Sequence, residues 1–186
     1  MNRPWVNANQ TQELMKITKL LVGILFLAST SMMAQEIANH TIGLRLGDSD
    51  GFGAEISYQK SIGRYNRAEL NFGYRDSREY DGIKAVAVFQ WIHTISSGFN
   101  WYYGFGGGAG NANFEARPDP NNANITIQPE GGLFVLVAGD LGIEYNFDNL
   151  PLLISLDIRP EIGIVGYGDF DDRFDFDIGL GVRYQF

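Results

Sequence analysis

The chain has 186 residues and no cysteine, and it is rich in glycine (23) and in aromatic residues, with 13 Phe, 9 Tyr and 3 Trp. The lack of cysteine excludes a disulfide framework, a thiol nucleophile and a cysteine-ligated metal. The formal net charge of −8 at pH 7 argues against a nucleic acid as partner, because phosphate binding requires a basic stripe. A chain of this length is expected to form one domain.

Residues 15–35 have the layout of a secretory signal peptide. Two lysines precede an apolar run over 20–28, and small and polar residues close the segment. The alternative is a transmembrane anchor, but this run is about half of the roughly 20 residues that a spanning helix needs. We expect cleavage near residue 35, so that the mature domain covers 36–186. Residues 1–14 form an upstream extension that need not be translated, with Met15 as the initiator.

The last ten residues, DIGLGVRYQF, alternate between large apolar side chains and small or polar ones. This period of two is typical of a strand with one apolar and one polar face. The apolar set is Ile178, Leu180, Val182, Tyr184 and Phe186, and the other set is Asp177, Gly179, Gly181, Arg183 and Gln185. No apolar stretch after residue 36 is long enough for a membrane helix, so any insertion into a membrane must use strands.

The same alternation recurs along the chain, least clearly in the fourth segment. It predicts further strands near 38–47, 52–60, 67–75, 83–93, 100–110, 133–147 and 152–163. The connections after the second, fourth and sixth strands are short. Those after the third, fifth and seventh contain REYDG, the segment 111–132 and GYGDFDDRF, and only GDSDG is short on that side. Short turns on one side and longer loops on the other are typical of outer-membrane barrels.

Charged residues on the polar faces decide where the apolar faces point. There are too many of them for the core of a soluble protein. They are Arg45, Glu55, Glu69, Arg75, Lys84, Asp140, Glu144, Asp157, Arg159, Glu161, Asp177 and Arg183. The sequence therefore predicts an all-β fold, an eight-stranded antiparallel up-and-down transmembrane β-barrel preceded by a cleavable signal peptide, with these residues as a polar network in the barrel interior.

Aromatic residues gather at both ends of the predicted strands, as expected for the two membrane interfaces. With a periplasmic amino terminus, the periplasmic belt contains Tyr58, Trp91, Trp101, Tyr145, Tyr184 and Phe186. The opposite belt contains Phe52, Tyr74 and Phe176.

These features resemble the small eight-stranded outer-membrane β-barrels, in particular the barrel domains common in Bacteroidetes. The resemblance covers about residues 37–186 and rests on the signal peptide, on GDLGIEYNFDNLPLLISLDIRPEIG and on the terminal YQF. It implies a bacterial outer-membrane location with both termini in the periplasm, surrounded by outer-membrane lipid. Tyr184 and Phe186 resemble the signal that the barrel assembly machinery reads. One departure is Pro160, which implies a bulge or a position at the rim of its strand.

The interior of an eight-stranded barrel is just wide enough to be filled by side chains. We therefore expect a packed ion network and no large pore, with a narrow channel as the alternative. The glycines of the fifth strand are expected to leave room for long inward side chains such as arginine. The role we expect is structural or surface-binding.

A lipid-modifying enzyme of the lipid A deacylase type is the catalytic alternative. It needs a serine and a histidine within hydrogen-bond reach. The two histidines, His40 and His93, fall on strands that are well apart, with Ser96 near the second. We expect no catalytic residues.

No cofactor or metal is expected. GDSDG and GDFDD carry closely spaced carboxylates, but neither matches a full calcium loop. The segment 111–132, rich in Asn and Pro, is the expected place for an extracellular ligand, because loops on rigid scaffolds carry recognition.

Overall fold

The computed structural model describes residues 37–47, 53–76, 80–119, 122–127, 131–166 and 173–186. Its elements are all strands: β1 His40–Leu46, β2 Ala54–Gly63, β3 Asn66–Asp76, β4 Tyr80–Ser96, β5 Phe99–Phe114, β6 Arg117–Asp119, β7 Asn122–Ile127, β8 Gly132–Asn146, β9 Leu152–Val165 and β10 Phe174–Gln185. In these ranges no helix is both long and apolar enough to cross a membrane, a finding that does not bear on strands.

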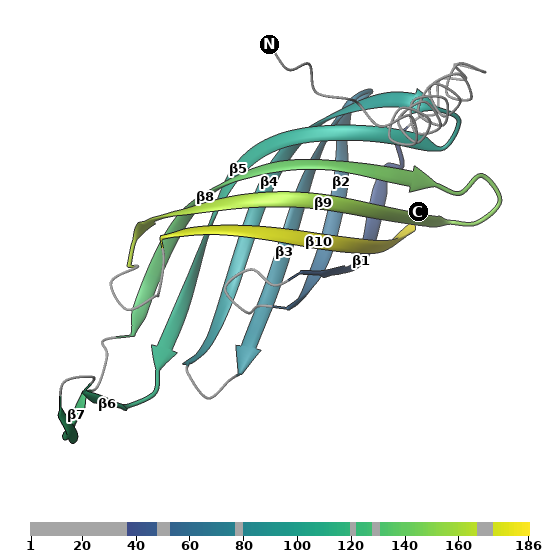
Figure 1. Ribbon diagram of the computed structural model, residues 1–186. Coiled ribbons are helices and arrows are strands. Elements are labelled where there is room, and N and C mark those ends of the chain that lie inside the picture. Colours follow the sequence, from purple (N-terminus) through teal and green to yellow (C-terminus); the bar gives the residue numbers. More distant parts are fainter. Residues whose placement is uncertain (1–36, 48–52, 77–79, 120–121, 128–130, 167–172) are drawn as a thin grey trace, which may run out of the picture.

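Eight of the strands form one closed antiparallel barrel in the order β1-β10-β9-β8-β5-β4-β3-β2. The ring closes where β1 pairs with β10, from Thr41 opposite Gln185 to Leu46 opposite Leu180. β6 and β7 form a separate two-stranded sheet that extends beyond one end of the barrel (Figure 1). The predicted eight-stranded up-and-down barrel is confirmed.

The two ends of the barrel differ in their connections. At the short-turn end, β2–β3 and β4–β5 are joined by two residues each, β8–β9 is joined by 147–151, and the chain ends at Phe186. Gly98, in the β4–β5 turn, has a φ of +79°, which glycine adopts without a steric penalty. The long-loop end carries the β1–β2, β3–β4 and β9–β10 connections and the segment that contains β6 and β7.

Two of the predicted loops are partly strand. β4 begins at Tyr80, whose ring packs on Phe114 with centroids 5.2 Å apart, so both strands continue past their predicted ends. REYDG is therefore not a long loop, and only residues 77–79 separate β3 from β4. The predicted loop 111–132 contains the end of β5, all of β6 and β7, and the first residue of β8. Cross-strand aromatic packing extended this ladder beyond what the alternation indicated.

The two faces of the barrel wall have opposite chemistry, as the alternation predicted. Leu44, Phe105 and Leu180 on the outer face are 50%, 66% and 43% exposed. Arg159 on the inner face is fully buried. This is the reverse of a soluble barrel, in which the large apolar side chains fill the interior.

The glycines of β5 serve a different purpose from the expected one. A Cβ on Gly108 would lie 2.9 Å from a methyl of Val86, and one on Gly104 would lie 3.0 Å from a methyl of Val88. These glycines therefore admit an apolar layer rather than arginines. This layer fills part of the interior and consists of Tyr80, Val86, Val88, Ala112, Phe134, Leu136 and Ala138.

Room for an arginine is made on β10 instead. A Cβ on Gly179 would lie 2.6 Å from Nε of Arg45, so a larger residue there would displace the guanidinium from its place across the strand. Glycine does make room for an arginine, as expected, but it does so on β10 and not on β5.

Pro160 lies within β9 and not at its rim. On one side it is paired with Phe176 of β10. On the other side, Gly139 and Asp140 of β8 have no partner on β9. The β8–β9 register is the same on both sides of this gap, and the register shift lies further along, between Val135 and Leu136. The missing N–H therefore interrupts the ladder locally without a bulge.

Leu180 tests the assignment of the outer face to lipid. It lies between Leu46 and Leu156 on neighbouring strands. We expect Leu180→Arg to lower the free energy of unfolding in lipid by about 2–4 kcal/mol, the cost of a cation at mid-bilayer depth. Urea titration of refolded protein measures the change, and Leu180→Phe, which adds no charge, is the control. An arginine variant as stable as this control would contradict the lipid-facing assignment.

Candidate functional site

The barrel interior contains the largest concentration of charge among the described residues. All the members are buried, with at most 4% of any residue exposed. Five are basic and seven acidic: Arg45, Arg67, Lys84, Arg159 and Arg183, and Glu55, Glu69, Asp140, Glu144, Asp157, Glu161 and Asp177. Charges this deep are tolerated only when they are paired and hydrogen-bonded.

Arg45 links four strands across the closing seam. Its Nε donates to Asp157 of β9 at 2.9 Å, and its Nη1 donates to Asp177 of β10 at 2.5 Å. The same Nη1 lies 3.4 Å from Glu55 of β2. A planar guanidinium offers five N–H donors in fixed directions, which suits it to three carboxylates at once.

Glu69 of β3 is the acceptor at the centre of the network. Its carboxylate accepts from Arg159 at 2.9 Å and from Arg183 at 3.3 Å. The amides of Gln59, Asn71 and Gln90 also donate to it, at 2.6, 2.9 and 3.1 Å respectively. Both carboxylate oxygens are therefore used. Arg183 is held further by the hydroxyls of Ser57 and Ser155.

Lys84 is paired with Glu161, with Nζ 3.0 Å from the carboxylate, and Glu55 lies 3.9 Å away. Asp140 accepts a hydrogen bond from the amide of Gln90.

Arg67 and Glu144 form an ion pair of 2.6 Å, and Arg67 also lies 4.8 Å from the ring centroid of Tyr102. Arg67 is absent from the predicted network although it has the same parity as Glu69, so the alternation could have identified it. Arg67 lies at the first residue of its predicted strand, where the pattern is weakest. Gln59 and Asn100 also lie at the ends of predicted strands and were missed for the same reason.

Arg75 differs from the other predicted members of the network. It is half-buried near the long-loop end, where its guanidinium lies 4.1 Å from the ring centroid of Tyr80 and donates to that hydroxyl at 3.0 Å. The remaining eleven predicted residues are buried in the interior.

Tyr184 and Phe186 lie on the outer face at the short-turn end. Phe186 stacks on the imidazole of His40 with centroids 5.5 Å apart, and Tyr184 stacks on Phe186 at 6.2 Å. The backbone N–H of Phe186 donates to the carbonyl of His40 at 2.9 Å, so the last residue of the chain is paired with the first residue of β1.

The two histidines lie in separate aromatic clusters. His40 Nδ1 is 2.7 Å from the Tyr58 hydroxyl, whereas His93 stacks on Trp101 with centroids 4.6 Å apart. They belong to β1 and β4, which are separated by two strands in the barrel order. The structure does not bring the two histidines together.

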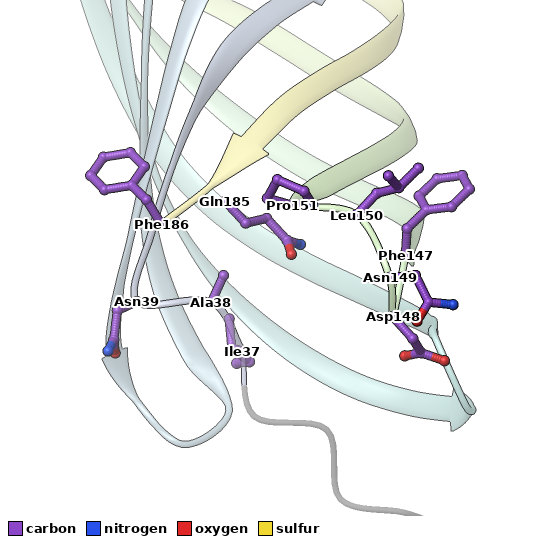
Figure 2. Close-up of a pocket in the computed structure, with 10 residues that line it drawn as sticks. All are labelled: Ile37, Ala38, Asn39, Phe147, Asp148, Asn149, Leu150, Pro151, Gln185 and Phe186. Atoms are coloured by element: carbon purple, nitrogen blue, oxygen red, sulfur yellow. The ribbon is translucent and has the colours of Figure 1, made fainter.

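A groove of about 600 Å³ opens at the short-turn end (Figure 2). Its lining consists of Ile37, Ala38, Asn39, Phe147, Asp148, Asn149, Leu150, Pro151, Gln185 and Phe186. Asp148 is the one titratable side chain among these ten. The side chains of this lining therefore contain no pair of nucleophile and base.

The acidic motif GDFDD and most of GDSDG lie outside the described residues. Within the described part of the chain, no three His, Cys, Asp or Glu side chains gather in a way that could hold a metal ion.

A closed barrel with an apolar outer wall and an ion-paired interior defines the class of eight-stranded membrane-type β-barrels. The chain is similar to the N-terminal β-barrel domain of Pseudomonas aeruginosa OprF, with 13% identity, a TM-score of 0.59, and 82% of this chain and 100% of that domain covered. It is also similar to Ail, the attachment invasion locus protein of Yersinia pestis, with 17% identity, a TM-score of 0.50, and coverage of 82% and 99%.

Neisserial surface protein A is a third similar structure, with 12% identity, a TM-score of 0.50, and coverage of 79% and 94%. At these identities the likeness establishes the fold. No protein-family model matches the chain, and no curated protein matches it.

The network predicts a large effect of removing its central acceptor. Glu69→Leu leaves Arg159 and Arg183 without their shared carboxylate, and breaking a buried ion pair costs about 3–5 kcal/mol. We expect the free energy of unfolding, measured by urea titration, to fall by that amount. The exposed Glu115 at the end of β5 is the control, and Glu115→Leu should change stability by less than about 0.5 kcal/mol. Equal effects of the two changes would contradict the central position of Glu69.

Proposed function

We propose that the protein is an integral outer-membrane β-barrel with a structural or surface-binding role. The observation that carries this proposal is the reversed polarity of the closed barrel. Rows of exposed apolar side chains cover the outer wall, while twelve charged residues are buried inside. In a bilayer a closed barrel satisfies all of its backbone groups internally, and lipid covers the apolar wall.

The filled interior supports a structural role over transport. Arg45, Arg159 and Arg183 reach across the lumen to carboxylates on other strands, and the apolar layer around Phe134 fills the space beside them. A path for solutes would require these side chains to rearrange. A narrow channel is the weaker alternative.

Surface binding is supported by the long-loop end. The β6–β7 hairpin extends from β5 and β8 beyond the rest of the barrel (Figure 1) and falls within the segment 111–132. With both termini in the periplasm, this hairpin faces the cell exterior, where it is the best-placed element for contact with an extracellular ligand.

The signal peptide at 15–35 supports export, and the stretch 139–163 with the terminal YQF supports a Bacteroidetes-type barrel. Catalysis of the lipid A deacylase type is disfavoured because neither histidine is hydrogen-bonded to a serine in the described part of the chain. His40 bonds to the Tyr58 hydroxyl, and His93 stacks on Trp101. We assign no catalytic residue.

Conductance tests the closed interior. We expect refolded protein to give no stable conductance steps in planar bilayers, because the side chains that fill the lumen are paired with one another. Circular dichroism confirms that the same preparation is folded. Large, ohmic steps in most insertions would contradict the proposal and favour a channel.

The carboxy-terminal aromatic tests assembly and location together. We expect deletion of Phe186 to lower the amount of protein in the outer-membrane fraction, because the terminal residue is read by the assembly machinery. The unfolding stability of refolded protein should change little, since Tyr184 and other rings of the belt remain.

Phe147→Ala is the control for this deletion, because it removes a ring at the same end that is not terminal.

Mass spectrometry of the parent in that fraction should give a chain that begins near Gln35. Normal abundance without Phe186 would refute the assembly signal, and absence of the parent from the fraction would refute the location.

A further inference from the structure

The β2–β3 hairpin ends in an exposed tip that combines a cation with apolar and aromatic side chains. Ile62 is 60% exposed and Tyr65 is 51% exposed, and the guanidinium of Arg64 lies 5.4 Å from the ring centroid of Tyr65. The tip is fixed in place, because the Tyr65 carbonyl accepts from the N–H of Ile92 at 2.8 Å and the Ser61 hydroxyl donates to the carbonyl of Gly63 at 2.9 Å.

Lys60 adds a second cation on the outer wall near this tip. It has the same parity as Ile56 and Tyr58, and its neighbours across the sheet are His40 on β1 and the small Ala68 on β3. Neither Lys60 nor Arg64 is paired with a carboxylate in the described part of the chain. Two cations therefore lie unneutralised at the edge of the apolar wall.

Acidic side chains are concentrated at the other end of the barrel. Asp76 and Asp81 lie directly opposite each other on β3 and β4, and Glu115 follows β5. At the short-turn end, Asp148 lies in the β8–β9 turn, and the barrel order places those strands away from β2 and β3. The terminal carboxylate of Phe186 lies beyond His40, two strands from Lys60. The region of Lys60 and Arg64 therefore has two cations near one carboxylate and is a local positive surface on an acidic protein.

We propose that Lys60, Arg64 and Tyr65 bind the headgroups of anionic phospholipids in the leaflet at the short-turn end. The apolar wall, Ile62 and the lysine stem fit the acyl and glycerol region, and the two cations fit the phosphates. Tyrosine is suited to this depth because its ring is apolar and its hydroxyl is polar. The inference rests on the proposed membrane location, with the short-turn end at the periplasmic leaflet.

Lipid retention tests this site. The protein is reconstituted in vesicles of equal phosphatidylglycerol and phosphatidylcholine, and lipids that stay bound are counted by native mass spectrometry. We expect an excess of phosphatidylglycerol that falls by about 25-fold in the double variant Lys60→Gln, Arg64→Gln, since each cation near an anionic surface contributes roughly fivefold. Arg173→Gln, which removes one charge at the opposite end, should leave the excess unchanged.

The parent alone provides a second measurement, because the excess should also shrink as salt is raised from about 0.1 M to about 1 M, where charges are screened within about 3 Å. No excess in the parent, or an equal loss in Arg173→Gln, would overturn the lipid site while leaving the barrel proposal intact. Failure to insert into either lipid would refute the membrane location itself.

Discussion

The structure depends on closure of the ring between β1 and β10. Backbone N–H and C=O groups in a bilayer have no water to bond, so an open edge would leave a row of them unsatisfied. The seam is short, because β1 has seven residues. Arg45 reinforces it from inside by bonding to carboxylates on β9 and β10, while Phe186 and His40 stack across it outside. The ion network inside and the aromatic belt outside thus both contact the short seam between β1 and β10.

The interior shows how buried charge specifies one arrangement of the barrel. Each guanidinium spans several strands, so a shift of register by one residue would turn its partners out of the lumen. Glu69 illustrates this, because its five donors come from β2, β3, β4, β9 and β10. Buried ion pairs add little net stability compared with apolar packing. We infer that their contribution here is to fix register.

The sequence predicted the fold well because alternation is a local signal. The inward parity of Arg45, Glu144 and Asp177 followed from their neighbours alone. What failed depended on contacts between strands: Tyr80 and Phe114 extended β4 and β5, and the glycines of β5 proved to face valines. Pro160 was misplaced because only the paired strand shows which backbone group lacks a partner. Arg67 was within reach of the pattern and was missed at a predicted strand boundary.

The pairing of the first barrel strand with the last has a kinetic consequence. Arg45 and Asp177 are separated by 132 residues. Contacts this distant in sequence can form only after nearly the whole chain is available, and the entropy of closing such a large loop slows their formation. The hairpins from β2 to β10 can form from local pairs, but the ring cannot. The barrel therefore cannot close until β10 is available to pair with β1. A factor that binds the unfolded chain before that point would control when the barrel forms.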